Sequence, residues 1–88
     1  MQDRLRTLAD IGQHIRQARK AAGLSTVEVA ARAGRSRDVL HRLEHGEDVS
    51  LSSLLMILGA IGQCIEITPA GPPTLAEMAR RFGAAGEE

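Results

Sequence analysis

With 88 residues, the chain is the length of one small domain, near the lower limit for building a hydrophobic core without help. Its single cysteine, Cys64, excludes a framework of intrachain disulfides and fits a reducing compartment. The N-terminus lacks the apolar stretch of a signal peptide, and the longest apolar run, residues 54–62, is about half of a membrane span. We therefore expect a soluble cytoplasmic protein with no membrane partner.

The formal net charge is zero, but the charges are unevenly distributed along the chain. Residues 14–46 contain seven Lys and Arg against three Asp and Glu, a net +4, whereas residues 47–88 contain two against six, a net −4. Such a separation allows a neutral protein to present a basic face to phosphates. An ordinary solvated helix surface explains the charge pattern equally well.

Four short helices are predicted, each preceded by a hydroxyl side chain that can cap its N-terminus. In chain order, these caps are Thr7, Ser25, Ser36 and Ser50. Asp10 and Glu28 stand three residues after the first two caps, as in a capping box. Glycines that favour the left-handed conformation end the helices, at Gly23, Gly34, Gly46 and Gly62.

Apolar residues at helical spacing predict the buried side of these helices. In the first helix this face consists of Leu8, Ile11, Ile15, Ala18 and Ala22. In the third helix, which runs through Glu44, the inward residues are Leu40 and Leu43. In the fourth helix we expect a wide apolar face made of Leu51, Leu54, Leu55, Leu58 and Ile61.

The fourth helix is followed by a segment with the pattern of a β-strand. Residues 64–68 alternate and are rich in β-branched side chains, and prolines at positions 69, 72 and 73 prevent extension. No second strand is evident, so its backbone groups need a partner on another molecule, most simply a second copy. We expect a homodimer whose interface consists of Cys64, Ile65, Glu66, Ile67 and Thr68, with Ile65 and Ile67 backed by the fourth helix.

The C-terminal tail, residues 70–88, has a weaker pattern. Thr74 and Glu77 form a possible capping box, and one helical face would carry Leu75, Met78, Ala79 and Phe82. The tail is therefore either a short helix or disordered. Its apolar stripe either docks back on the domain or awaits a partner, and we expect a mobile tail that contacts a partner protein or serves in turnover.

The second and third helices have the pattern of a helix-turn-helix motif. Ala30 is small enough for a close crossing of the two helices, and Gly34 permits a positive φ in the turn. Apolar anchors that lock the pair stand at Val29, Ala33, Leu40 and Leu43.

Over residues 8–62 the sequence resembles the Xre family, the Cro/cI-type helix-turn-helix regulators. The resemblance rests on Ile11-Gly12, Ile15-Arg16, Arg19-Lys20, Gly23-Leu24-Ser25, Glu28, Ala30, Ala33-Gly34, Ser36-Arg37, Leu40, Arg42-Leu43-Glu44, Gly46, Ser50-Leu51, Leu54 and Gly62. The strand after it looks like the HipB-type antitoxin branch. The resemblance implies a mainly α, four- to five-helix lambda-repressor-like domain over residues 1–63, a dimerising strand at 64–69 and a tail at 70–88.

The resemblance also implies which residues meet DNA. The recognition helix would begin at Ser36 and enter the major groove with its N-terminal end. Arg37 is suited to a bidentate guanine contact, and Asp38 either accepts from a cytosine amino group or orients Arg37. Arg42 lies one turn further along. Phosphate-contacting positions of the family correspond to Ser25, Thr26 and His45.

Several residues depart from the family pattern or have another role in it. Thr26 replaces a frequent Gln, which shortens the reach to the DNA backbone. Arg35 occupies a usually apolar turn position, where it either faces solvent and phosphate or covers the core edge with its stem. His41 faces outward and touches either DNA or nothing. Arg19 and Glu44 match a structural ion pair between the first and third helices.

Other chemistry finds little support in the sequence. His41 and His45 are four residues apart, but further metal ligands are missing, and Cys64 lacks a positioned base. We expect no enzyme activity, no metal and no cofactor. Three functions remain: an antitoxin-type repressor that binds its own operator and a HipA-like kinase toxin, a stand-alone Xre regulator, and an interaction module that has lost DNA binding.

Overall fold

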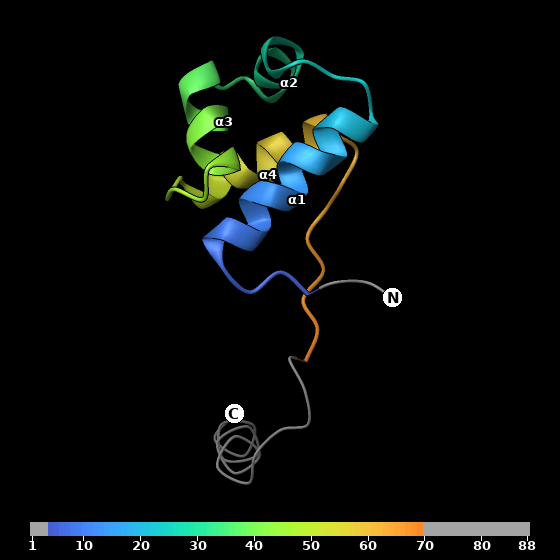
Figure 1. Cartoon of the computed structure of the whole chain (residues 1–88), viewed down its shortest axis with the longest axis vertical. Helices are drawn as coiled ribbons and strands as arrows, with labels where there is room; N and C mark the ends of the chain where they lie inside the picture. The colour runs from blue at the N-terminus through green and yellow to red at the C-terminus, as the bar shows by residue number, and fades with distance from the viewer. Residues whose placement is uncertain (1–3, 70–88) are drawn as a thin grey trace, which may run out of the picture.

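Four helices make up most of the chain that the structure describes. The structure is a computed structural model that describes residues 4–69. Its helices are α1 (Leu8–Ala21), α2 (Thr26–Ala33), α3 (Arg37–Glu44) and α4 (Leu51–Ala60), shown in Figure 1. The four predicted helices are thus confirmed, with nearly the predicted ends. None of the described helices is long and apolar enough to cross a membrane.

Local hydrogen bonds explain where the helices begin and end. Thr7 and Asp10 form a reciprocal capping box, and Ser25 and Glu28 form a second one. Ser36 and Ser50 each accept a hydrogen bond from the amide three residues later. All four predicted terminators have a positive φ: Gly23, Gly34, Gly46 and Gly62. Capping satisfies amides that a helix N-terminus would otherwise leave without partners.

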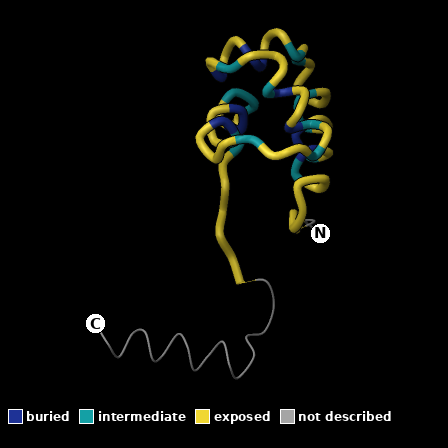
Figure 2. The backbone as a smooth tube through the Cα atoms, turned by 90° about the vertical axis from the view of Figure 1, so that its left-hand side faces the viewer, coloured by how far each residue is buried: buried dark blue, intermediate teal, exposed yellow. Residues whose placement is uncertain are grey.

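The core lies where the four helices meet. α1 packs mainly on α3, α4 packs mainly on α2, and α2 and α3 pack on each other. The buried positions in Figure 2 lie on the inner sides of these helices. The core contains the motif anchors predicted from the sequence together with residues of α1 and α4: Ile15, Val29, Ala30, Ala33, Leu40, Leu43, Ile57 and Leu58.

Gly12 allows α1 and α3 to approach closely. A Cβ atom at this position would overlap the carbonyl oxygen of Leu43 and lie 2.9 Å from that of Glu44. These are backbone atoms of the last turn of α3, which a side chain cannot push aside without moving the helix. Gly12 therefore sets the distance between the two helices.

The predicted buried faces of α1 and α4 need correction. Leu8 and Ala22, at the two ends of the α1 face, are exposed, because the 14-residue α1 is longer than the eight-residue α3 on which it packs. In α4, Leu51 is 67% exposed and Leu55 is also exposed, whereas Ser53 is only 6% exposed.

The reason in α4 is its composition. The helix carries apolar residues on most sides, so helical spacing alone does not select which side is buried. Ile57, which was not part of the predicted face, is fully buried. The buried hydroxyl of Ser53 is tolerated because the side chains of Ser50 and Arg35 donate hydrogen bonds to it.

The segment after α4 passes α1 and then extends beyond the helices as an open stretch of chain (Figure 1). Residues 63–69 form no helix or strand, and no strand occurs within residues 4–69. Ile67 is 93% exposed. Since the predicted strand pairs with a second copy, a single chain does not test it, and it stays a prediction. The predicted capping box and apolar stripe of residues 74–82 lie outside the described residues.

Candidate nucleic-acid interface

A tight turn joins α2 to α3. Gly34 adopts φ 65° and ψ 33°, a left-handed conformation that favours glycine. The amide of Arg35 donates to the carbonyl of Ala30 at 3.0 Å, and the amide of Gly34 donates to that of Ala31 at 3.2 Å. Ala30 and Ala33 are buried beside the turn. Two short helices are therefore held at a fixed angle by a turn and a shared core.

The outer face of α3 is polar and accessible. Leu40 and Leu43 face the core, which leaves five exposed residues on the other side: Arg37, Asp38, His41, Arg42 and His45. Within residues 4–69, the side chains of Arg37 and Asp38 form no hydrogen bond or ion pair. Both lie in the first turn of α3, where the amides of residues 37 and 38 also have no intrahelical acceptor. The N-terminal end of α3 can therefore donate hydrogen bonds to, and accept them from, another molecule.

Arg42 is engaged by the protein itself. Its Nη2 donates to the carbonyl of Asp48 at 3.0 Å, and its own carbonyl accepts from the amide of Glu47 at 2.9 Å. These bonds fasten the loop that follows α3. Arg42, which the sequence predicts to face DNA, is thus exposed and also hydrogen-bonded within the protein.

The rings of His41 and His45 lie one turn apart, with their centroids 4.1 Å from each other and their planes tilted by 41°. His45 Nδ1 lies 2.7 Å from the carbonyl oxygen of His41, and since a carbonyl only accepts, Nδ1 carries the proton. The other ring nitrogen, Nε2, donates a hydrogen bond only when the ring is protonated. A phosphate contact from His45 through Nε2 therefore requires the imidazolium form.

Arg35 points back into the fold. Its Nε donates to Ser53 Oγ of α4 at 2.9 Å, and its Nη1 donates to the carbonyl of Gly34 at 3.1 Å. Of the two alternatives considered for Arg35, these contacts favour the one in which the side chain covers the core edge. Arg35 ties the turn to α4.

The N-terminus of α2 presents a second polar edge. Ser25 Oγ accepts from the amide of Glu28, and the Glu28 carboxylate accepts from the amide of Ser25. These bonds hold the pKa of Glu28 below its usual range, with a smaller contribution from nearby Arg32. The amides of Thr26 and Val27 lack intrahelical acceptors, and Val27 is exposed. Sequence reasoning missed Val27 because the available group is its backbone amide, and its side chain gives no signal.

An ion pair connects α1 to α3. Arg19 Nε lies 2.7 Å from Glu44 Oε2, Arg19 Nη2 lies 3.0 Å from Glu44 Oε1, and Arg19 Nη1 donates to the carbonyl of Leu24. The hydrogen bond to Glu44 raises the pKa of Arg19 above its ordinary value. This two-point contact fixes the orientation of both side chains, which are therefore used to hold α1 against α3.

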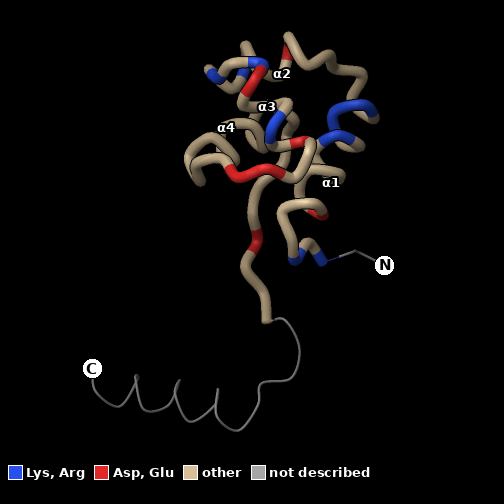
Figure 3. The backbone as a smooth tube through the Cα atoms, turned by 60° about the vertical axis from the view of Figure 1, so that its left-hand side comes forward, with Lys and Arg blue, Asp and Glu red and all other residues tan. Residues whose placement is uncertain are grey.

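Charge on the described chain follows this arrangement. Most basic positions lie along the C-terminal half of α1 and around α2 and α3, and two more, Arg4 and Arg6, precede α1 (Figure 3). The acidic pair Glu47 and Asp48 lies in the loop between α3 and α4. Within residues 4–69, no group of three or more His, Cys, Asp or Glu side chains is placed to hold a metal ion.

Two capped helices, a left-handed turn and a polar outer face on the second helix define a helix-turn-helix domain, a DNA-binding module. The family model described as "Helix-turn-helix domain" matches residues 10–63, more than half of the chain, and the chain belongs to this family. No curated protein matches the chain.

Proposed function

We propose that this chain is a sequence-specific transcriptional repressor that binds double-stranded operator DNA as a homodimer. One observation carries the proposal: Arg37 and Asp38 stand exposed at the start of α3 with no partner within residues 4–69. Most other side chains of the turn and of α3 are buried or bonded to the protein. The exposed and unpartnered side chain of Arg37 supports a base-reading role.

In the proposed mechanism, α3 reads the bases and the start of α2 positions the domain on the DNA backbone. α3 enters the major groove with its N-terminal end, and Arg37 makes a bidentate contact with the O6 and N7 atoms of guanine. Asp38 accepts from a cytosine amino group or holds Arg37 in place. The two amides at the start of α2, beside Ser25 and Thr26, donate to a phosphate and set the register of the domain on the duplex.

Two copies joined through residues 64–68 would place two recognition helices on one side of the duplex. The supporting observations are the exposed Ile65 and Ile67 and the position of this segment, which leaves the domain on the side away from α2 (Figure 1). A two-fold dimer binds a palindrome whose half-sites are about one helical turn, or a multiple of it, apart. Function by binding alone requires neither a catalytic residue nor a cofactor.

Selection from a library of random duplexes tests the proposal. The full chain should enrich an inverted repeat with this spacing, and the enriched duplex should bind more tightly than random DNA at the same salt concentration. Enrichment of no sequence would contradict it and favour a protein-interaction module. Enrichment of a single half-site would support base reading and contradict binding as a dimer.

Within this proposal, the likeness of residues 64–68 to the HipB-type branch favours an antitoxin over a stand-alone regulator, with a HipA-like kinase as the toxin partner. Co-expression with the product of a neighbouring kinase-like reading frame tests this step. A complex that co-purifies and loses its toxicity supports the antitoxin role. Absence of such a frame or of such a complex leaves a stand-alone repressor.

A further inference from the structure

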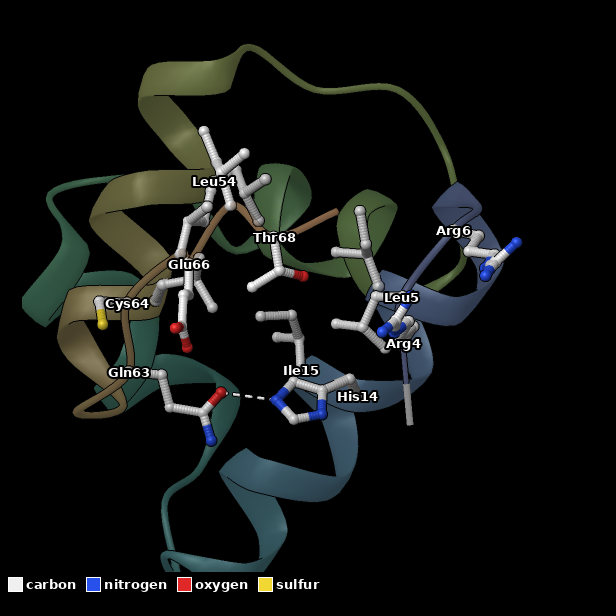
Figure 4. A pocket seen from close by; sticks show the side chains of 14 residues that line it. Arg4, Leu5, Arg6, His14, Ile15, Leu54, Gln63, Cys64, Glu66 and Thr68 are labelled. Atoms are coloured by element: carbon white, nitrogen blue, oxygen red, sulfur yellow. Dashed lines mark hydrogen bonds between the residues drawn. The ribbon is translucent and has the colours of Figure 1, made fainter. Parts of the chain in front are cut away.

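A groove of about 760 Å³ lies between α1 and α4. Its walls are the N-terminal residues 4–6, one side of α1, one side of α4, and the segment 63–68. Figure 4 shows Arg4 and Leu5 on one side of the groove and Cys64 and Glu66 on the other. A hydrogen bond of 2.6 Å between His14 Nε2 and Gln63 Oε1 closes one end.

Half of the residues that line the groove are apolar: Leu5, Ile11, Ile15, Leu54, Leu58, Ile65 and Ile67. The charged residues Arg4, Arg6 and Glu66 also line it. Leu5 remains 43% exposed and Ile65 44% exposed, although the domain has only a small core. Covering apolar surface is favourable, so the apolar part of this groove favours an apolar occupant. The His14–Gln63 bond pairs two polar side chains at that end, and Glu66 lies beside them (Figure 4).

Of the two alternatives for the tail, a mobile segment and one docked on the domain, we propose the second here: residues 74–82 of the same chain occupy the groove as an amphipathic helix. Their apolar residues recur at the spacing of one helical face: Leu75, Met78, Ala79 and Phe82. Phe82 is the only aromatic residue of the chain. A segment of nine residues is too short to form a stable helix alone in water, and packing in the groove supplies what it lacks.

The connection between groove and tail supports an occupant from the same chain. Thr68 lines the groove, and only residues 69–73 separate it from the first residue of the stripe segment. Five residues reach at most about 17 Å, so the tail starts close to the groove mouth. A tether this short gives an effective concentration in roughly the millimolar range, well above that of a second copy in dilute solution. The inference does not depend on DNA binding.

Cys64 reports on the groove directly. It is the only cysteine, it is exposed in the described domain, and it lines the groove. The rate of its alkylation by iodoacetamide is measured in the full chain and in the full-length Leu75→Ser/Phe82→Ser variant. Both are measured at a protein concentration where sedimentation shows single chains, because pairing of residues 64–68 with a second copy would also cover the thiol. A docked tail shields the thiol, so the variant should react several-fold faster. A matched variant, Ala76→Ser/Ala85→Ser, changes tail residues outside the stripe and should react like the unmodified chain.

A groove substitution separates docking from other effects of the tail. Leu5→Gln should accelerate alkylation in the full chain and add little in the Leu75→Ser/Phe82→Ser background, because both changes release the same contact. Leu51→Gln, at an exposed α4 position outside the groove, should change neither rate. Additive effects of the tail and groove substitutions would overturn the proposal.

Two further results would also contradict it. Equal alkylation rates in the full chain and the tail variant would mean that the stripe does not cover the groove. Shielding that disappears on dilution would assign the occupant to a second copy, since docking within one chain does not depend on protein concentration. Circular dichroism and thermal melting of each variant establish that the four-helix domain remains folded during the measurement.

Discussion

At the scale of single residues, the arginines of this domain fall into two groups, those bonded to the protein and those that face outward. Arg19, Arg35 and Arg42 donate to acceptors of the protein, whereas Arg37 extends outward with no partner within residues 4–69. The acceptors of Arg19 and Arg35 lie on other helices, 25 and 18 residues away in the chain. Sequence alone therefore predicts the basic character of this region and does not assign the internal role of Arg35.

Arg35→Met tests that internal role. We expect the free energy of unfolding to fall by about 1–2 kcal/mol, because the bond to Ser53 is lost and the methionine stem keeps only part of the packing. The affinity for DNA and its salt dependence should stay unchanged, since Arg35 is occupied within the fold. Urea unfolding and binding titrations at two salt concentrations measure the two quantities.

The control is Arg16→Met, at an exposed α1 position, which should change stability by less than about 0.5 kcal/mol. If Arg35→Met instead reduces the salt slope by about one and leaves stability intact, Arg35 contacts phosphate. That result would reverse the assignment made from the contacts.

Glu28 links stability to pH. Its pKa is lowered in the folded state by the amide and hydroxyl of Ser25, so the charged form stabilises the fold at neutral pH. This contribution is fully present above the unfolded-state pKa and is lost as the pH falls through the lowered folded-state pKa. Glu28→Ala should therefore reduce the free energy of unfolding at pH 7, and the reduction should shrink at acidic pH.

Urea unfolding at a series of pH values measures this difference. Glu47→Ala serves as the control, because Glu47 lies exposed in a loop and outside the capping boxes. A Glu28→Ala deficit that is the same at every pH would show that the carboxylate charge has no part in the cap.

At the scale of the elements, local and non-local features were not equally predictable. Caps and terminating glycines act within four residues, so the helix boundaries followed from the sequence. The close approach at Gly12 and the burial of Ser53 depend on the distance to another helix. The turn around Gly34 and the exposure of Arg37 were predictable because the helix-turn-helix pattern is itself compact in sequence.

Two glycine substitutions separate close packing from helix propensity. Gly12→Ala should cost about 1–3 kcal/mol, because its Cβ meets backbone oxygens of α3 that cannot yield without moving the helix. Gly59→Ala, inside α4, meets nothing within 4 Å and should stabilise the protein by about 0.5–1 kcal/mol through better helix propensity. Thermal unfolding compares the two variants, and a neutral Gly12→Ala would refute the close-approach account.

At the scale of the whole molecule, the surfaces proposed to meet DNA and a second copy lie apart. Segment 64–69 leaves the helices on the side away from α2 (Figure 1). A proline at Ile67 should therefore break strand pairing without harming the helices, since Ile67 is 93% exposed in the single chain. The lost amide and the clash of the ring with the ladder should weaken the dimer at least about tenfold.

Sedimentation analysis of Ile67→Pro measures the dimer, with Ile67→Val as a control that keeps the amide and a β-branched side chain. The valine variant should remain dimeric. A proline variant that stays fully dimeric at micromolar concentration would show that residues 64–68 do not form the dimer interface.

The most direct test of the central claim, base reading by α3, is a binding titration of Arg37→Ala on the selected operator and on random DNA at two salt concentrations. The account predicts a loss of about 1–3 kcal/mol on the operator, a much smaller loss on random DNA and relaxed preference at one base pair. Thr26→Ala, at the edge proposed to face phosphate, should weaken both DNAs more evenly. Equal losses for Arg37→Ala on operator and random DNA would contradict the base-reading role.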